Sequence, residues 1–253
     1  MKNILRLIKK VVNKLILLTT SKLTIIFKHM TFKLQTTNFI IGESELQYQP
    51  LPWIGLNKAQ IRGDATRIRW DLIKQNLTSS DNSLKDIGSC YGFFCFKFAE
   101  MSKSNQAIGI DSNKKFFDVA NYVIEKNESF RNQVYFLNSK ITPQNIYILP
   151  PTDVTLILSI WHHWYFYYGQ ENALKMLKNV IDKTNKKIFI EIGEDEVAEE
   201  FNYPVKKDVK NWFKELLKKE LSINLQEIGL SEAGSYQHYE IKNHKRTLFL
   251  IEK

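Results

Sequence analysis

The chain has 253 residues, 43% of them hydrophobic and 25% charged, which suits a globular protein with a sizeable core. Its two cysteines, Cys90 and Cys95, are too close in sequence for a disulfide framework, and no cysteines and histidines show the spacing of a zinc site. A small disulfide scaffold is thereby excluded, and a reducing, cytoplasmic setting is predicted. The formal net charge is +9.

Nearly all of this charge lies in residues 1–40, which carry eight Lys and Arg side chains and no acid. Apolar residues recur there at helical spacing, namely Ile4, Ile8, Val11, Leu15 and Leu18. The pattern predicts a basic amphipathic helix that lysines interrupt too often for a transmembrane span. We expect residues 1–30 either to lie on an anionic membrane surface or to pack on the body or on a second subunit. RNA binding is a third alternative.

Residues 41–80 are predicted to form an extended segment and a helix that packs on the following domain. The prolines of Tyr48-Gln49-Pro50-Leu51-Pro52 favour an extended backbone. Residues 58–77 show helical spacing. The expected inner face holds Ile61, Ala65, Ile68, Leu72 and Ile73, and the expected outer face holds Arg62, Arg67, Arg69 and Lys74.

From residue 81 onward, short apolar runs alternate with longer amphipathic stretches. Strands are predicted over 84–87, 107–110, 133–137, 154–159 and 187–191, and helices over 92–102, 113–127, 170–183 and 205–221. Two further strands are predicted over 223–229 and 246–252, with 236–242 extended between them. This alternation predicts an α/β fold in which a parallel sheet has helices on both faces.

One stretch combines a strand end, a glycine turn and a helix start, and it reads Asp86-Ile87-Gly88-Ser89-Cys90-Tyr91-Gly92. The glycines let the backbone approach a ligand closely, and N–H groups at the helix start are expected to face that ligand. The next predicted strand ends in Asp111, whose carboxylate can accept hydrogen bonds from ribose hydroxyls. The arrangement predicts a site for a nucleotide-containing ligand.

The spacing Asp86-x-Gly88-x-x-x-Gly92 differs from G-x-G-x-x-G and resembles motif I of the class I S-adenosylmethionine (SAM) dependent methyltransferases. The resemblance makes residues 81–253 the methyltransferase domain. It implies a Rossmann-like sheet closed by an antiparallel strand pair, with SAM as the cofactor. It also implies that Asp86 fixes the loop and the methionine end, that Asp111 holds the ribose, and that Ser89 belongs to the site. Cys90 stands where the family has its central glycine.

The apolar run 154–159 predicts a buried parallel strand, and ligands bind outside the carboxyl ends of such strands. By chain order it is the fourth strand, where the resemblance implies a catalytic group, and Ser159 at its end is expected in the cofactor site. His162 and His163 follow. Either could act as a general base, since a free imidazole has a pKa of about 6.5, or could orient the acceptor. Alternatively, both cap the strand and wall the pocket with the neighbouring tryptophans.

Two further positions are assigned in the same way. Asn138 follows the third predicted strand, where the resemblance places the adenine, and its amide can hydrogen-bond the adenine edge. Glu191 ends the fifth predicted strand and is followed by Glu194, Asp195 and Glu196. This acidic cluster is interpreted as a solvated turn, and no metal is assigned to it.

Motif I does not identify the acceptor, because a methyl sulfonium requires little more than an aligned nucleophile. The segment from Tyr48 to Trp70 loosely resembles bacterial methyltransferases of unassigned or cell-surface-glycan pathways, so a glycan or another small metabolite is the expected acceptor. An RNA methyltransferase is an alternative, disfavoured because residues 41–253 carry a net charge of only +1. Another is a non-catalytic SAM-binding module at a membrane. A dehydrogenase using NAD is disfavoured by the glycine spacing.

Overall fold

The structure is a computed structural model that describes residues 48–57, 63–237 and 240–253, with side chains left undescribed over 232–244. Residues 46–253 form one compact unit. The N-terminal extension over 1–40, with the membrane, packing and RNA roles expected of it, lies outside the described residues. Within the described part of the chain, no helix is both long and apolar enough to cross a membrane.

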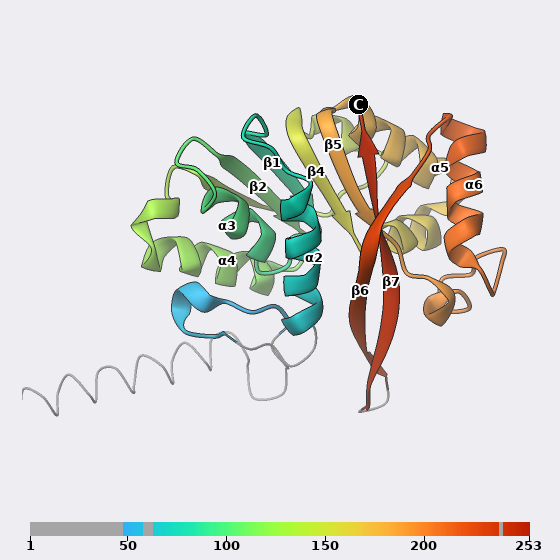
Figure 1. The fold of residues 1–253 in the computed structure, drawn as a ribbon, viewed down its shortest axis with the longest axis horizontal. Coiled ribbons are helices and arrows are strands. Elements are labelled where there is room, and N and C mark those ends of the chain that lie inside the picture. The colour runs from blue at the N-terminus through green and yellow to red at the C-terminus, as the bar shows by residue number, and fades with distance from the viewer. Residues whose placement is uncertain (1–47, 58–62, 238–239) are drawn as a thin grey trace, which may run out of the picture. The chain divides into compact units, whose positions relative to one another are not determined.

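Seven strands form one sheet in the order β3-β2-β1-β4-β5-β7-β6 (Figure 1). Five of them are parallel, namely β1 (Ser83–Ile87), β2 (Gln106–Asp111), β3 (Val134–Asn138), β4 (Thr152–Leu158) and β5 (Thr184–Glu191). Two antiparallel strands complete the sheet beside β5, namely β6 (Gln226–Gln237) and β7 (Glu240–Glu252). The predicted Rossmann-like sheet with an antiparallel closing pair is confirmed. Its strand order reverses beside β1, which is where such sheets bind ligands.

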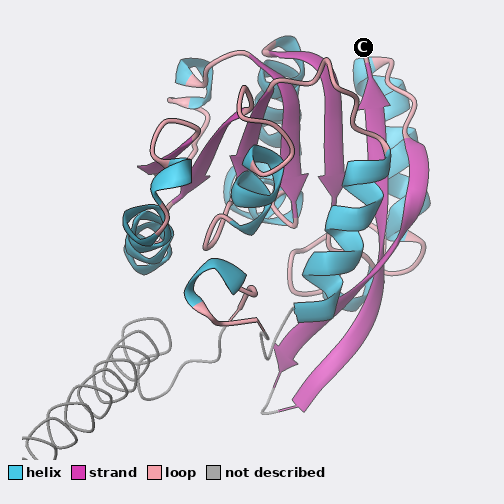
Figure 2. Ribbon diagram, turned by 60° about the vertical axis from the view of Figure 1, so that its left-hand side comes forward, coloured by secondary structure: helices cyan, strands magenta, loops and turns pink. Residues whose placement is uncertain are grey.

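Helices cover both faces of the sheet (Figures 1 and 2). One face carries α2 (Gly63–Gln75), α3 (Phe93–Ala99) and α4 (Lys114–Lys126), and the other carries α5 (Trp161–Asp182) and α6 (Val209–Leu221). In the described part of the chain, short 3₁₀ helices lie in the connections, namely η1 (Pro52–Ile54), η2 (Glu128–Phe130), η3 (Ile146–Ile148) and η4 (Asp195–Val197). Because α3 and α5 begin directly after β1 and β4, their first turns lie at the crevice.

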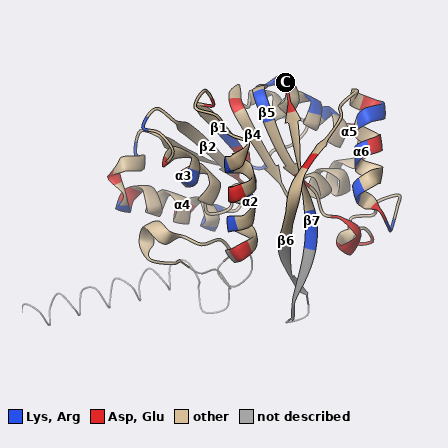
Figure 3. Ribbon diagram, in the orientation of Figure 1, with Lys and Arg blue, Asp and Glu red and all other residues tan. Residues whose placement is uncertain are grey.

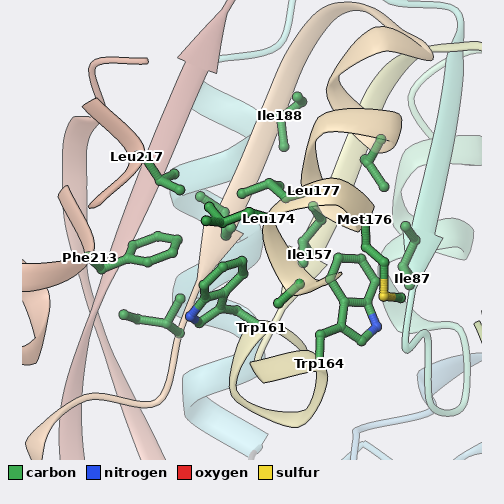
Figure 4. Packing of buried hydrophobic residues seen from close by; sticks show 14 of the residues in the cluster. Ile87, Ile157, Trp161, Trp164, Leu174, Met176, Leu177, Ile188, Phe213 and Leu217 are labelled. Carbon is green, nitrogen blue, oxygen red and sulfur yellow. The ribbon is translucent and has the colours of Figure 1, made fainter. Parts of the chain in front are cut away.

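The core beneath α5 holds the start of that helix in place (Figure 4). Trp161 is fully buried, and its ring centroid lies 5.0 Å from that of Phe213 in α6. Trp164 is 4% exposed and belongs to the same cluster as Ile87 of β1. Burial of such side chains contributes about 1.5–3 kcal/mol each. The two tryptophans therefore fix the short stretch that carries both histidines.

This packing also explains why α5 begins at Trp161 and not near residue 170 as predicted. Gly169 has a φ of 76° and a ψ of 165°, which interrupts the helix and resembles a helix boundary in the sequence. The residues before it are nevertheless helical, because Trp161 and Trp164 are three residues apart and bury their side chains on one face. The aromatic residues from Trp161 to Tyr168 therefore form helical turns next to the carboxyl end of β4.

Candidate functional site

Two adjoining cavities lie at the carboxyl ends of β1, β2 and β4. The larger, of about 370 Å³, is lined by residues that include Ser139, Lys140, Trp164 and Tyr167. The smaller, of about 190 Å³, is lined by residues that include Tyr48, Gln49, Thr66, Arg69, Asp86 and Cys90. Both are lined by Gly88, Asp111, Ile160 and His163, so the two form one elongated cleft.

The turn between β1 and α3 has left-handed backbone at three positions, with φ of 79° at Gly88, 52° at Cys90 and 82° at Gly92. A Cβ atom on Gly88 would lie 2.2 Å from Cδ1 of Ile160, and one on Gly92 would lie 2.2 Å from Cζ of Phe136. Glycine is thus required by conformation and by space. Cys90 adopts a conformation that costs a side-chain-bearing residue roughly 1–2 kcal/mol, which accounts for a glycine there in the family that the motif resembles.

Backbone N–H groups of this turn donate within the protein. Gly88 and Ser89 donate to the carbonyl of Ile110 (2.8 and 3.1 Å), Cys90 donates to Oδ2 of Asp111 (2.8 Å), and Gly92 donates to the carbonyl of Ser89 (2.8 Å). Phe93, the first residue of α3, donates to Oε1 of Gln49 at 3.4 Å. The expectation that the helix-start N–H faces a ligand is therefore wrong for Phe93, because Gln49 from the preceding segment caps it.

The two acids of the predicted motif lie in different surroundings. Burial, with the nearby Asp111, raises the pKa of Asp86 to about 8, and its Oδ2 atom has no hydrogen-bond partner among the described residues. Burial also raises the pKa of Asp111, although N–H groups of Asn113 and Cys90 oppose this shift at 2.8 Å each. A buried carboxyl oxygen without a partner, at a cavity wall, suits a ligand group that is cationic or donates a hydrogen bond.

We expect the Asp86→Asn variant to be more stable than the wild type at neutral pH. The pKa of Asp86 is about 8 in the folded state against 3.8 ordinarily, so between these values the folded state retains a proton that the unfolded state has released. Rising pH therefore lowers the wild-type free energy of unfolding across this range, and the amide variant lacks this loss. Thermal unfolding of the ligand-free protein from about pH 4 to about pH 9 measures the difference.

Asp153→Asn is the matched control. Burial alone would raise the pKa of Asp153, but the N–H of Asn82, with other polar neighbours, holds it below 3.8. Its removal should therefore lower stability at neutral pH, the opposite sign. A pH profile for Asp86→Asn that parallels the wild-type profile would contradict the assignment for Asp86.

The structure separates the two histidines. His162 is 5% exposed, its Nδ1 atom accepts a hydrogen bond from the N–H of Gly193 at 3.0 Å, and it lines neither cavity. His163 is exposed and lines both cavities. Its ring lies nearly parallel to that of Tyr167, at 15° and 6.4 Å between centroids. His163 is thus the histidine that can reach a bound ligand.

Of the remaining residues predicted for the cofactor site, some line a cavity and others do not. Ser159 lines the smaller cavity with a φ of 60°, and its hydroxyl donates to Oε1 of Glu191 at 2.8 Å. Ser89, Gly92 and Asn138 line neither cavity. The Asn138 amide donates to the backbone carbonyl of Asp111 at 3.0 Å. An adenine contact by Asn138 stays a prediction, and the adjacent cavity wall is formed by residues 139–141.

A buried charge network borders the smaller cavity. Arg69 is 3% exposed and donates to both carboxyl oxygens of Glu191, from Nε at 2.5 Å and from Nη2 at 2.8 Å. Arg246 approaches Glu191 at 3.8 Å and pairs with Glu196 at 2.5 Å. Burial would raise the pKa of Glu191, but Arg69 foremost and also Arg246 lower it to about 2.

This network corrects two sequence interpretations. Arg69 lies inside and not on the outer face of α2, because its charge is paired with a carboxylate 122 positions along the chain. The acidic cluster is a solvated turn only in part: Glu191, the last residue of β5, is fully buried, Glu196 pairs with Arg246, and the exposed Asp195 accepts N–H hydrogen bonds at the start of α6. Among the described residues, no three His, Cys, Asp or Glu side chains are grouped as metal ligands would be.

Replacing Glu191 by glutamine should lower the free energy of unfolding at pH 7 by roughly 3–5 kcal/mol, because two buried guanidinium groups then lose their shared carboxylate. The pKa of Glu191 is about 2 against an ordinary 4.5, so its stabilisation is present in full above about pH 4.5 and is lost as pH falls through about 2. Urea unfolding measures the change. Glu227→Gln, which removes an exposed partner of Lys210 and Lys214, should cost less than about 1 kcal/mol. Equal losses in both variants would contradict the prediction.

Comparisons with known proteins bear on the fold. No family model and no curated protein matches the chain. Among solved structures, the bifunctional kinase-methyltransferase WbdD matches with a TM-score of 0.64 and 21% identity, over 85% of this chain and 45% of that chain. The chain thus spans less than half the length of WbdD. Magnesium protoporphyrin IX methyltransferase (ChlM) from Synechocystis PCC 6803 with bound SAH matches with a TM-score of 0.51 and 12% identity, over 75% of this chain and 81% of that chain. The chain therefore has the Rossmann-like fold seen in these methyltransferases.

Proposed function

We propose that the protein is a SAM-dependent methyltransferase. The observation that carries the proposal is the left-handed turn from Gly88 to Gly92, set between Asp86 and Asp111 beside the cleft at the reversal of the strand order. The residues fit the cofactor in two respects. Gly88 and Ile160 meet where both cavities are lined and leave no room for a side chain on Gly88, and Asp86, which lines the smaller cavity, has a buried oxygen without a partner among the described residues. The matching folds of two methyltransferases support the same reading.

The two cavities suit the two ends of SAM. The larger has room for the adenosine part, with Ser139 and Lys140 on its wall. Asp111 lies where the cavities meet, so its carboxylate is placed to accept a hydrogen bond from a ribose hydroxyl. Asp86 borders the smaller cavity, where it would face the methionine part.

The methyl transfer asks two things of the chain. SAM supplies an electrophilic methyl group, so the protein must align an acceptor and, for a hydroxyl acceptor, remove its proton. His163 lines both cavities and is exposed, so it is the side chain placed to accept that proton. The His162 ring packs beside it, with 4.4 Å between centroids, and Nδ1 of His162 accepts a hydrogen bond from the N–H of Gly193.

We propose a small hydroxyl-bearing acceptor, such as a metabolite or the end of a glycan. Two features support this over RNA. The net charge of residues 41–253 is +1, and Figure 3 shows Lys and Arg interspersed with Asp and Glu over the described elements. An RNA-binding surface would gather positive charge on one face.

Calorimetry with SAM, with its demethylated product and with NAD tests the cofactor. The first two should bind, and NAD should not. Incubation with methyl-labelled SAM and fractionated cell extract then identifies the fraction that takes the label. Binding of NAD in preference to SAM would overturn the proposal.

A further inference from the structure

The methionine end of SAM carries a carboxylate, and the turn between β1 and α3 offers no evident partner for that carboxylate. A carboxylate that leaves water needs hydrogen-bond donors to replace it. The glycine turn led us to expect that helix-start N–H groups face the ligand, but Gln49 accepts from Phe93, and the N–H groups of Gly88, Ser89 and Cys90 donate to Ile110 and Asp111. Side chains at the smaller cavity are placed to supply such donors.

We propose that Arg69, together with Thr66, binds the carboxylate at the amino-acid end of the cofactor. The proposal rests on the proposed function and assigns a role to α2, which precedes the motif. Both residues line the smaller cavity, as do Asp86 and Gly88 of the turn. They are three positions apart on α2, so their side chains share one helix face.

Arg69 has a donor group to spare. Its Nε and Nη2 atoms bind Glu191, and within the described part of the chain its Nη1 atom has no partner. The Thr66 hydroxyl likewise has none there. Neither atom is among the fully buried polar atoms that lack a partner. One guanidinium edge is therefore held by the protein while another N–H pair remains for a ligand.

Arg69 is not the only residue that interacts with the Glu191 carboxylate. The same carboxylate lies 3.8 Å from Arg246 and accepts hydrogen bonds from Ser159 at 2.8 Å and Ser231 at 2.6 Å. The Arg69 guanidinium is thus held in place by a carboxylate that also interacts with Arg246 and accepts hydrogen bonds from two serines. A guanidinium held in this way loses little conformational freedom when it binds an anion.

Calorimetry on the full chain tests the proposal with SAM and with decarboxylated SAM, which lacks only the carboxylate. Wild type should bind decarboxylated SAM about 10- to 100-fold more weakly than SAM, as expected for lost hydrogen bonds to a charged group. Arg69→Gln should bind SAM as weakly as decarboxylated SAM and should bind the latter as wild type does. Arg67→Gln, an exposed neighbour on α2, should change neither affinity.

Thr66→Val leaves the Arg69–Glu191 network intact and should lower in part the preference for SAM over decarboxylated SAM. If Arg69→Gln does not fold, this variant provides the test. Equal wild-type affinity for the two ligands would overturn the proposal while leaving SAM binding established. The proposal would also be overturned if the Arg69→Gln variant folds but its affinities for SAM and for decarboxylated SAM fall by the same factor. If neither ligand, nor methylthioadenosine, binds the wild type, the proposed function itself fails and this assignment with it.

Discussion

The Gly88→Val variant is expected to lose SAM binding by roughly 100-fold or more while its sheet stays folded. Gly88 has a φ of 79°, and a Cβ atom there would lie 2.2 Å from Cδ1 and 2.8 Å from Cγ1 of Ile160. Ile160 lines both cavities, so its displacement would push it into the cleft that the ligand needs. Calorimetry with SAM measures the loss, and circular dichroism with thermal unfolding reports the fold.

Gly55→Val is the matched control for this variant. Gly55 has a φ of 81°, close to that of Gly88, but a Cβ atom there would meet nothing within 4 Å. The control therefore shares the backbone strain and lacks the collision. It should bind SAM as the wild type does. Wild-type affinity in Gly88→Val would show that the cofactor does not approach this turn.

Replacing His163 by alanine should lower turnover by about 10²–10⁴-fold and leave SAM affinity unchanged, as expected for the loss of a general base. His163 lines both cavities, whereas its side chain takes no part in the tryptophan core. Transfer from labelled SAM to the fraction that accepts the methyl group measures turnover. Calorimetry on the same preparation measures affinity.

His162→Ala is the comparison, and its effect should differ in kind. It removes a buried acceptor of the Gly193 N–H and leaves a space beside Phe201. We expect a lower melting temperature, with turnover in the remaining folded protein reduced far less than in His163→Ala. Full activity in a folded His163→Ala variant would remove this histidine from the mechanism. Parallel loss of affinity and turnover would make it a binding residue.

The sequence by itself determined the fold class and the place of the cleft. Buried parallel strands are continuous apolar runs, and each such run ended in a turn residue or an acid, as at Asp86-Ile87-Gly88 and at Asp111. Left-handed backbone at Gly88 and Gly92 follows from the same local rule, because glycine adopts it without strain. These features depend on residues a few positions apart, and such short-range patterns can be read directly.

Contacts between distant parts of the chain were decided only by the tertiary structure. The charge of Arg69 favours a place outside the helix, and only Glu191, 122 positions away, makes its burial favourable. Adjacent histidines on a helix point about 100° apart, so the burial of Trp161 and Trp164 had to set which one meets the cleft. Gln49 caps α3 from 44 positions upstream. In each case the free energy of a buried charge, ring or hydrogen bond depends on a partner that folding brings near, and local sequence does not contain that partner.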